Sequence, residues 1–200
     1  MTPFEILAGP ITLWLAPVGT AFPLITTAPA VAWTKVGTNG DMNYDEGGVE
    51  VSLTQKIEDA RPAGSTAAVK AWRTEEDFML SANVWDVTLE QFRIAMNAAT
   101  VTTVAAGVGT AGTKKIGLIR GADVATYALI ARGKLSGYGD GYVGQYELPI
   151  CYQSGNIKPV YRKGKPVGLA LEFTALADLT AATEIERFGR LIQQHQAPLP

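Results

Sequence analysis

The sequence predicts a mainly β protein, a β-sandwich or barrel with one flanking α-helix and a C-terminal helix. Its 21 glycines and 11 prolines divide 200 residues into short segments rich in Val, Ile, Thr, Tyr and Trp. Such segments, bounded by turn-forming residues, are typical of strands in all-β folds. We expect a single domain over residues 1–200, with an N-terminal arm over about 1–30 and a C-terminal helical extension over about 178–200.

The composition predicts a surface that is partly covered by other copies. Hydrophobic residues make up 47% of the chain and charged residues 18%, below the roughly 25% of an average soluble protein. No run approaches the ~18 apolar residues of a membrane helix, and Glu5 stands where a signal peptide is apolar. We therefore expect no membrane insertion and synthesis in the cytoplasm.

The chain has few residues suited to metal or redox chemistry, with one cysteine, Cys151, and one histidine, His195. They allow no intramolecular disulfide and no soft ligand set for zinc, so Cys151 is expected to pack as a small apolar residue. A net charge of −2 without a dense Lys/Arg cluster argues against tight nucleic-acid binding. We expect no cofactor.

Strand patterns begin at Ile11–Ala16 and Val31–Val36. The apolar stretch AFPLITTAPA between them is expected to be a loop or arm, because proline cannot donate to a strand ladder. The clearest strand is Val49–Glu58, whose apolar and polar side chains alternate and so lie on opposite faces. The segment around Trp72 has helical propensity, but alternation from about Phe78 onward favours a strand there.

Thr88–Ala98 is the best helix, since Thr88 and Gln91 form a capping-box pattern before an apolar stripe. About ten residues cannot form a core alone, so this helix should pack on a sheet. A second helix is expected over Thr183–Gln194, with Thr183 and Glu186 as its capping box and His195 capping its carboxyl end. Further strands are expected at Lys114–Arg120, Thr126–Arg132, Val143–Tyr152 and Val167–Ala175.

The stretch GDMNYDEGGVE, Gly40–Glu50, places Asp and Asn side chains at alternate positions, as calcium loops do. An EF-hand loop needs glycine at position 6 and a bidentate glutamate at position 12. Counted from Asp41, those positions are Glu46 and Ser52. The stretch is therefore interpreted as the turn that enters the Val49 strand.

Three glycines, Gly107, Gly109 and Gly112, match G-x-G-x-x-G. A dinucleotide site needs a helix to follow, whereas KKIGLIRG is strand-like, and the Walker Gly-Lys-Ser/Thr order is missing. An inter-strand turn is expected there. GYGDGYVG, Gly137–Gly144, is interpreted as a hairpin tip, with sugar or base stacking by its tyrosines as the alternative.

Residues Val49–Ala99 resemble the major tail tube protein of long-tailed bacteriophages. The shared order is an alternating strand, a long loop, a strand near the Thr74–Glu76 run and an Asp-x-Thr-Leu-Glu helix start at Asp86–Glu90. The resemblance implies hexameric rings stacked into a tube, whose continuous inner β-barrel conducts DNA during ejection. It also implies tape-measure, tail-terminator and tail-tip proteins as partners, and a place in the virion after assembly in the host cytoplasm.

A channel for DNA should repel phosphates slightly, so an acidic or mixed lining is expected under this resemblance. The loop Asp59–Thr66 would reach the neighbouring subunit, and the N-terminal arm and C-terminal helix would contact adjacent rings. The lining candidates are Glu50, Ser52, Thr54, Lys56, Glu58, Glu75 and Asp77. The candidate contact residues of the loop are Arg61, Pro62, Ala63, Gly64 and Ser65.

Other functions stay open at this point. A head–tail or tail-terminator ring protein would stop at single rings. A carbohydrate-binding β-sandwich module would use Tyr138, Tyr142 and the tryptophans as stacking surfaces. An enzyme is the weakest alternative and is not expected, because the Glu75–Asp77 run has no accompanying nucleophile, base and oxyanion donor.

Overall fold

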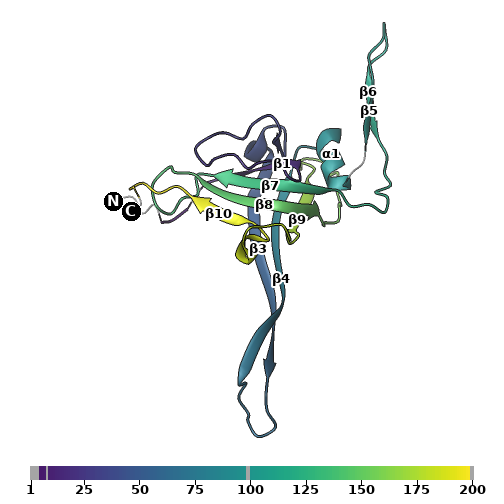
Figure 1. The fold of residues 1–200 in the computed structure, drawn as a ribbon. Coiled ribbons are helices and arrows are strands. Elements are labelled where there is room, and N and C mark those ends of the chain that lie inside the picture. Colours follow the sequence, from purple (N-terminus) through teal and green to yellow (C-terminus); the bar gives the residue numbers. More distant parts are fainter. Residues whose placement is uncertain (1–4, 8, 98–99, 199–200) are drawn as a thin grey trace.

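The computed structural model describes residues 5–7, 9–97 and 100–198, and its fold is mainly β, as predicted (Figure 1). Eight strands form one sheet: β1 (Ile11–Pro17), β2 (Thr34–Lys35), β3 (Tyr44–Ala60), β4 (Lys70–Val84), β7 (Thr126–Gly133), β8 (Gly144–Gln153), β9 (Leu169–Ala175) and β10 (Arg190–Gln193). Their order is β2-β1-β7-β8-β9-β4-β3, with β10 added beside β8, and all pairs are antiparallel.

The remaining elements lie outside this sheet. They are the helix α1 (Leu89–Met96), a separate two-stranded hairpin of β5 (Val101–Val104) and β6 (Thr113–Ile116), and the 3-10 turns η1 (Gly40–Asn43) and η2 (Glu184–Glu186). The β5–β6 hairpin stands away from the body beyond α1, and the β3–β4 hairpin projects in another direction (Figure 1).

The sheet curls around a single large core. The Tyr44 hydroxyl accepts a hydrogen bond from the Leu13 amide at 3.0 Å and donates one to the Val36 carbonyl at 2.9 Å. Because β1 and β3 lie near opposite ends of the strand order, these bonds bring the two ends of the sheet together. The fully buried side chains between them include Leu13, Leu80, Leu129, Leu148, Leu171 and Phe173.

The outer face of β1 and β7 is also covered. Trp33 packs with Ala128 and Ile130 of β7 and stacks on Phe22, with ring centroids 5.5 Å apart. Phe22 and Trp33 belong to the loop between β1 and β2. The Arg132 guanidinium donates hydrogen bonds to the Ile25 and Thr27 carbonyls of this loop. Of the expected N-terminal arm, residues 11–17 therefore form a strand of the sheet and this loop packs on it, while residues 1–4 and 8 lie outside the described residues.

The helix prediction is confirmed over α1, but its capping box is wrong. Thr88 precedes the helix without a side-chain capping bond, and the Gln91 Oε1 atom accepts from the Gly37 amide at 2.9 Å instead. The carboxylate of Asp86 takes the capping place by accepting from the Thr88 amide and from Thr38. Burial alone would raise the pKa of Asp86, but these hydrogen bonds outweigh it and hold the pKa below its ordinary value. Ala98, the expected end of the helix, lies outside the described residues.

The prediction of a C-terminal helix over Thr183–Gln194 is wrong. The segment contains only the short turn η2, after which Gly189 adopts a φ of 123° and the chain enters β10. Gly189 lies so close to the Glu147 carbonyl that a Cβ atom would collide with it, and the Arg190 Nε atom bonds the Glu147 carboxylate at 2.7 Å. Pairing with β8 thus overrides an apolar spacing that also fits a helix.

Without that helix, the expected capping role of His195 is also wrong. Its ring lies 5.2 Å from that of Tyr138, and its Nδ1 atom is 2.8 Å from the Ala197 carbonyl. The packing prediction for Cys151 is confirmed, because its side chain is fully buried and burial raises the pKa of the thiol to about 12.

Several strand bounds differ from the prediction. The Val31–Val36 pattern yields only the two residues of β2, and the Lys114–Arg120 pattern yields the shorter β6. Conversely, β4 begins at Lys70, well before Phe78, because each residue from there is paired with β3 or bulged against it. The sequence patterns did not predict β5, and they did predict the strands that became β1, β3, β7, β8 and β9.

Replacing Tyr44 with Phe should lower the free energy of unfolding by about 1–3 kcal/mol, because two buried backbone groups lose their partner. Urea unfolding measures this, with the exposed Tyr161→Phe as control. Burial raises the pKa of Tyr44 above its ordinary value, so its contribution is present below about pH 10 and is lost at higher pH. As the pH rises above 10, the free energy of unfolding should therefore fall less in Tyr44→Phe than in the wild type. An equal fall in both proteins would contradict the role of the Tyr44 hydroxyl in stabilising the fold.

Candidate functional site

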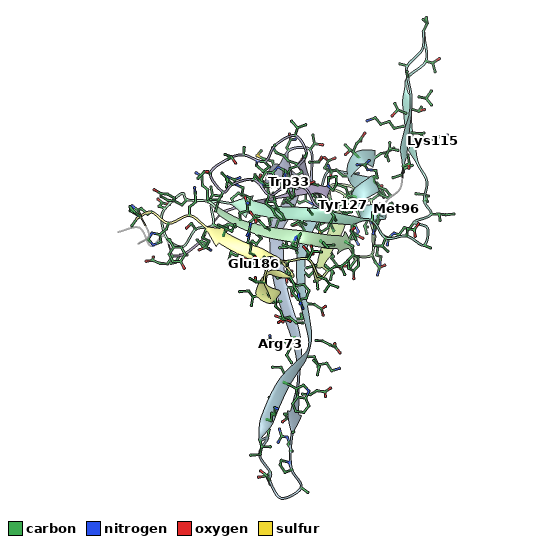
Figure 2. All side chains as sticks on the ribbon, in the orientation of Figure 1. Trp33, Arg73, Met96, Lys115, Tyr127 and Glu186 are labelled. Carbon is green, nitrogen blue, oxygen red and sulfur yellow. The ribbon has the colours of Figure 1, made fainter. Side chains whose placement is uncertain are left out.

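The most distinctive feature of the molecule is the long hairpin of β3 and β4. β3 is an edge strand, and β4 pairs with β9 only over Met79–Val84. Beyond that point the hairpin consists of two strands alone, and both outer backbone edges lack a strand partner within the described chain. We call residues 53–78 the distal hairpin. It extends far from the body, with Arg73 midway along it (Figures 1 and 2).

The register of β3 with β4 places all seven lining candidates on one face, which we call the polar face. Opposed residues of an antiparallel pair lie on the same side of the sheet. The pairs are Glu50 with Ser81, Ser52 with Met79, Thr54 with Asp77, Lys56 with Glu75 and Glu58 with Trp72. Alternation had already placed the β3 candidates together, but only the register shows that Glu75 and Asp77 join them.

The polar face is acidic and open to solvent. Lys56 Nζ lies 3.0 Å from the Glu75 carboxylate, with the two side chains 58% and 63% exposed. Such an exposed ion pair contributes only about 0–1 kcal/mol to stability. Counting Lys70, which pairs with Ala60 near the tip, the face carries four carboxylates and two ammonium groups, a net charge of −2.

The opposite face of the distal hairpin continues the core outward as an apolar ledge. Leu53, opposed to Phe78, is 69% exposed, and Ile57 further out is 55% exposed. At the base, an apolar hollow of about 360 Å³ is lined by Leu53, Phe78 and Phe188 among others. Exposed apolar side chains of this size, close to an apolar hollow, mark a surface that another chain can cover.

Polar side chains share this face, because the Gln55–Glu76 pair stands between Leu53 and Ile57 and Arg73 lies opposite Ile57. Arg73 donates to the Gln55 side chain at 2.9 Å and bonds Glu76 at 3.3 Å. Glu76 therefore lies on the other face of the hairpin from its sequence neighbours Glu75 and Asp77. Between Lys56 and Ile57 the register shifts, leaving Thr74 as a bulge that donates to the Lys56 carbonyl at 3.3 Å. A bulge of this kind increases the local twist of the ribbon.

The expected contact loop lies at the tip of this hairpin and is ordered by its own bonds. Arg61 lies 2.8 Å from the Asp59 carboxylate and donates to the Thr66 carbonyl at 3.2 Å. The Ser65 amide closes a turn on the Pro62 carbonyl at 2.9 Å. Arg61, Pro62, Ala63 and Gly64 are exposed and Ser65 is half-buried, so the loop presents a formed surface at the farthest point from the core.

The Gly40–Glu50 stretch forms η1 and the start of β3, and its polar side chains serve separate partners. Asp41 accepts from the Thr12 hydroxyl at 2.7 Å, Asn43 accepts from the Asn39 amide, and Asp45 accepts from Asn83 and Gly47. They do not converge on a point where an ion could sit. Across the described ranges, no group of three His, Cys, Asp or Glu side chains is arranged to hold a metal.

The glycine motifs also form turns. Gly107 pairs with Thr110 in a bridge at the tip of the β5–β6 hairpin, where Gly109 has a φ of 74°, so the predicted inter-strand turn is confirmed. Of the side chains considered for sugar stacking, Tyr138 and Tyr142 share the connection between β7 and β8, whereas Trp33 and Trp72 lie on other parts of the chain. Trp33 is buried within the loop between β1 and β2, Tyr138 packs on His195, and Trp72 lies on the distal hairpin.

Sequence reasoning missed two further surfaces. One is the β5–β6 hairpin, which VTTV and TKKI on either side of a glycine-rich turn could have indicated. The other is a basic loop before β9, in which KPVYRKGK supplies four cations within eight residues.

Comparison with known proteins matched no family model and no curated sequence. Within the described residues, no helix has both the length and the apolar character needed to cross a membrane.

Amide hydrogen exchange should separate the distal hairpin from the body. In the monomer, amides over 53–60 and 70–77 should exchange far faster than those of the buried strand β7, because a two-stranded ribbon with free edges is marginally stable in water. Any assembly that covers the hairpin should protect these amides selectively. Equal protection of both regions in the monomer would contradict this view of the hairpin.

Proposed function

We propose that this chain is the structural subunit of the tail tube of a long-tailed bacteriophage, which assembles into stacked hexameric rings around a channel for DNA. The observation that carries the proposal is the distal hairpin, with two free backbone edges, an apolar ledge on one face and an acidic polar face on the other. The resemblance over Val49–Ala99 supplies the family and covers the same hairpin.

Edge chemistry favours assembly through this hairpin. A long strand edge exposes unpaired N–H and C=O groups that bond readily to another strand, and monomeric proteins usually block such edges. Here both edges of the distal hairpin are open, and no proline interrupts either paired strand. When copies stand side by side in a closed ring, the hairpins can pair with one another and no edge remains.

The difference between the two faces determines which one would line the inside of such a barrel and which would face the subunit bodies. Leu53 continues the core side of the sheet, and Ile57 lies on the same face beyond the Gln55–Glu76 pair, so this face would be covered by the bodies of the subunits. The polar face would then line the channel. Its net negative charge disfavours the release of counterions that holds DNA on basic surfaces, so DNA could pass without being retained.

Negative-stain electron microscopy of the purified protein, with light scattering over a concentration series, tests the proposal. Hollow tubes support a tube subunit, whereas rings that never polymerise indicate a terminator-type ring protein. A chain that stays monomeric at high concentration, and also on added tail tips, contradicts both.

Deleting Pro62–Ser65 should abolish tubes while leaving a folded monomer, because the tip lies far from the core and makes bonds only within itself and to its own hairpin. Circular dichroism and sedimentation of the variant check the fold, and microscopy checks assembly. Normal tubes from this deletion would contradict the contact role of the loop.

Charge reversal on the polar face should convert the channel from one that repels DNA to one that retains it. The double variant Glu58→Lys with Asp77→Lys should assemble and bind short duplex DNA with strong salt dependence. The matched control, Asp123→Lys with Asp140→Lys, makes the same change in net charge at exposed sites outside the hairpin. Equal DNA retention by both variants, measured with fluorescent duplexes on assembled tubes, would contradict the assignment of the polar face to the channel.

A further inference from the structure

Charge is segregated along the chain on either side of β9. The loop that precedes this strand contains Lys158, Arg162, Lys163 and Lys165, and no acidic residue occurs from Ser154 to Leu171. The segment that follows it contains Asp178, Glu184 and Glu186, and no Lys or Arg occurs from Pro166 to Glu186. Because one precedes Leu169 and the other follows Ala175, they lie at opposite ends of one strand.

The basic loop forms a concave surface with unused charge. Lys158, Val160, Arg162 and Lys165 line an open hollow of about 630 Å³, whose floor includes Ala170 of β9. Tyr161 is 73% exposed beside it. None of the six ion pairs between described residues involves the four cations of the loop, Lys158, Arg162, Lys163 and Lys165. The loop therefore forms a cationic hollow whose lining also includes Val160, Pro166 and Ala170, and no acidic side chain lines it.

The acidic segment is a surface of opposite charge beside two hollows: Ile185 borders the hollow at the base of the distal hairpin, and Asp178 and Glu186 border a second hollow of about 170 Å³. The turn η2 places Ile185, 90% exposed, between Glu184 and Glu186. Asp178 is held ionised nearby, since bonds from the Thr180 hydroxyl and amide keep the pKa of its carboxyl below the ordinary value. Only Glu184 has an ion-pair partner, Arg187, at 3.1 Å on the surface.

We propose that the basic loop of one copy receives the η2 turn of the next copy, with Ile185 against Val160 and Tyr161 and the flanking carboxylates against the cations. This inference rests on the proposed self-assembly and names one contact within it. Because donor and acceptor lie at opposite ends of β9, the contact is heterologous, so each copy can add another in the same direction. Such a contact suits the stacking of copies along an axis, whereas the distal hairpins act within a ring.

Paired charge reversals test this contact. The basic-loop variant Arg162→Glu with Lys163→Glu and the acidic-segment variant Glu184→Lys with Glu186→Lys should each weaken self-association by about tenfold or more at low salt. Mixing the two variants in equal amounts should restore association, because every junction of an alternating chain again joins opposite charges. The control Lys35→Glu with Lys134→Glu makes the same charge change as the basic-loop variant, on exposed residues outside both surfaces.

Sedimentation velocity and electron microscopy of all four proteins at low and high salt give the readout. Loss of long assemblies in each variant, with recovery in the mixture, is the expected result. Wild-type-like assembly of both variants overturns the contact and leaves the tube proposal standing. Charge-dependent chains without hollow tubes support the contact and contradict the tube. If the basic loop instead binds duplex DNA, with binding lost in Arg162→Glu/Lys163→Glu and assembly unchanged, its occupant is nucleic acid and the contact is overturned.

Discussion

Backbone hydrogen bonding between β3 and β4 is the interaction on which the functional surfaces of this molecule depend. At the base, β4 is held on its other side by β9, and its side chains Leu80, Ala82 and Val84 are buried in the core. Further out, the two strands have only each other. Near the body, the β3–β4 pair is therefore part of a close-packed domain. Further out, it is a two-stranded ribbon that is only marginally stable in water. Beyond the Leu53–Phe78 pair the strands contribute no side chain to the buried core, and this length of exposed strand is what motivates the proposed assembly.

Local patterns predicted what depends on local sequence. Strict alternation over Val49–Glu58 identified the most important strand, and the apolar stripe after Thr88 identified α1. Long-range pairing decided the elements that were missed or wrong. The segment around Trp72 has helical propensity but forms a strand, because its backbone bonds to β3. The segment after Gly189 forms β10, because it pairs with the first residues of β8. β4 pairs with the strand that precedes it in a hairpin, and β10 pairs with β8, which is separated from it by β9; propensity alone carries no information on such pairs.

The candidate site shows the same division. Alternation placed Glu50, Ser52 and Glu58 on one face without any knowledge of the fold. Joining Glu75 and Asp77 to them required the register, which includes the bulge at Thr74 that no sequence rule locates. The capping pattern at Thr88 and Gln91 failed because Asp86, two residues before Thr88, accepts from the Thr88 amide, and the Gln91 side chain accepts from the Gly37 amide, which is distant in sequence.

Ring closure and stacking, as inferred here, should respond to salt in opposite ways. Closing hairpins into a barrel gathers the net charge of −2 on each polar face into one narrow channel, and this repulsion weakens as salt screens it. The contact between the basic loop and the η2 turn joins opposite charges at the surface, so the same screening weakens it. The channel lining and the stacking surface adjoin at the base of the hairpin, where Ile185 and Asp77 line one hollow. A change in ionic strength alone can favour closed single rings at one extreme and long open chains at the other, with complete tubes where both interactions are strong enough.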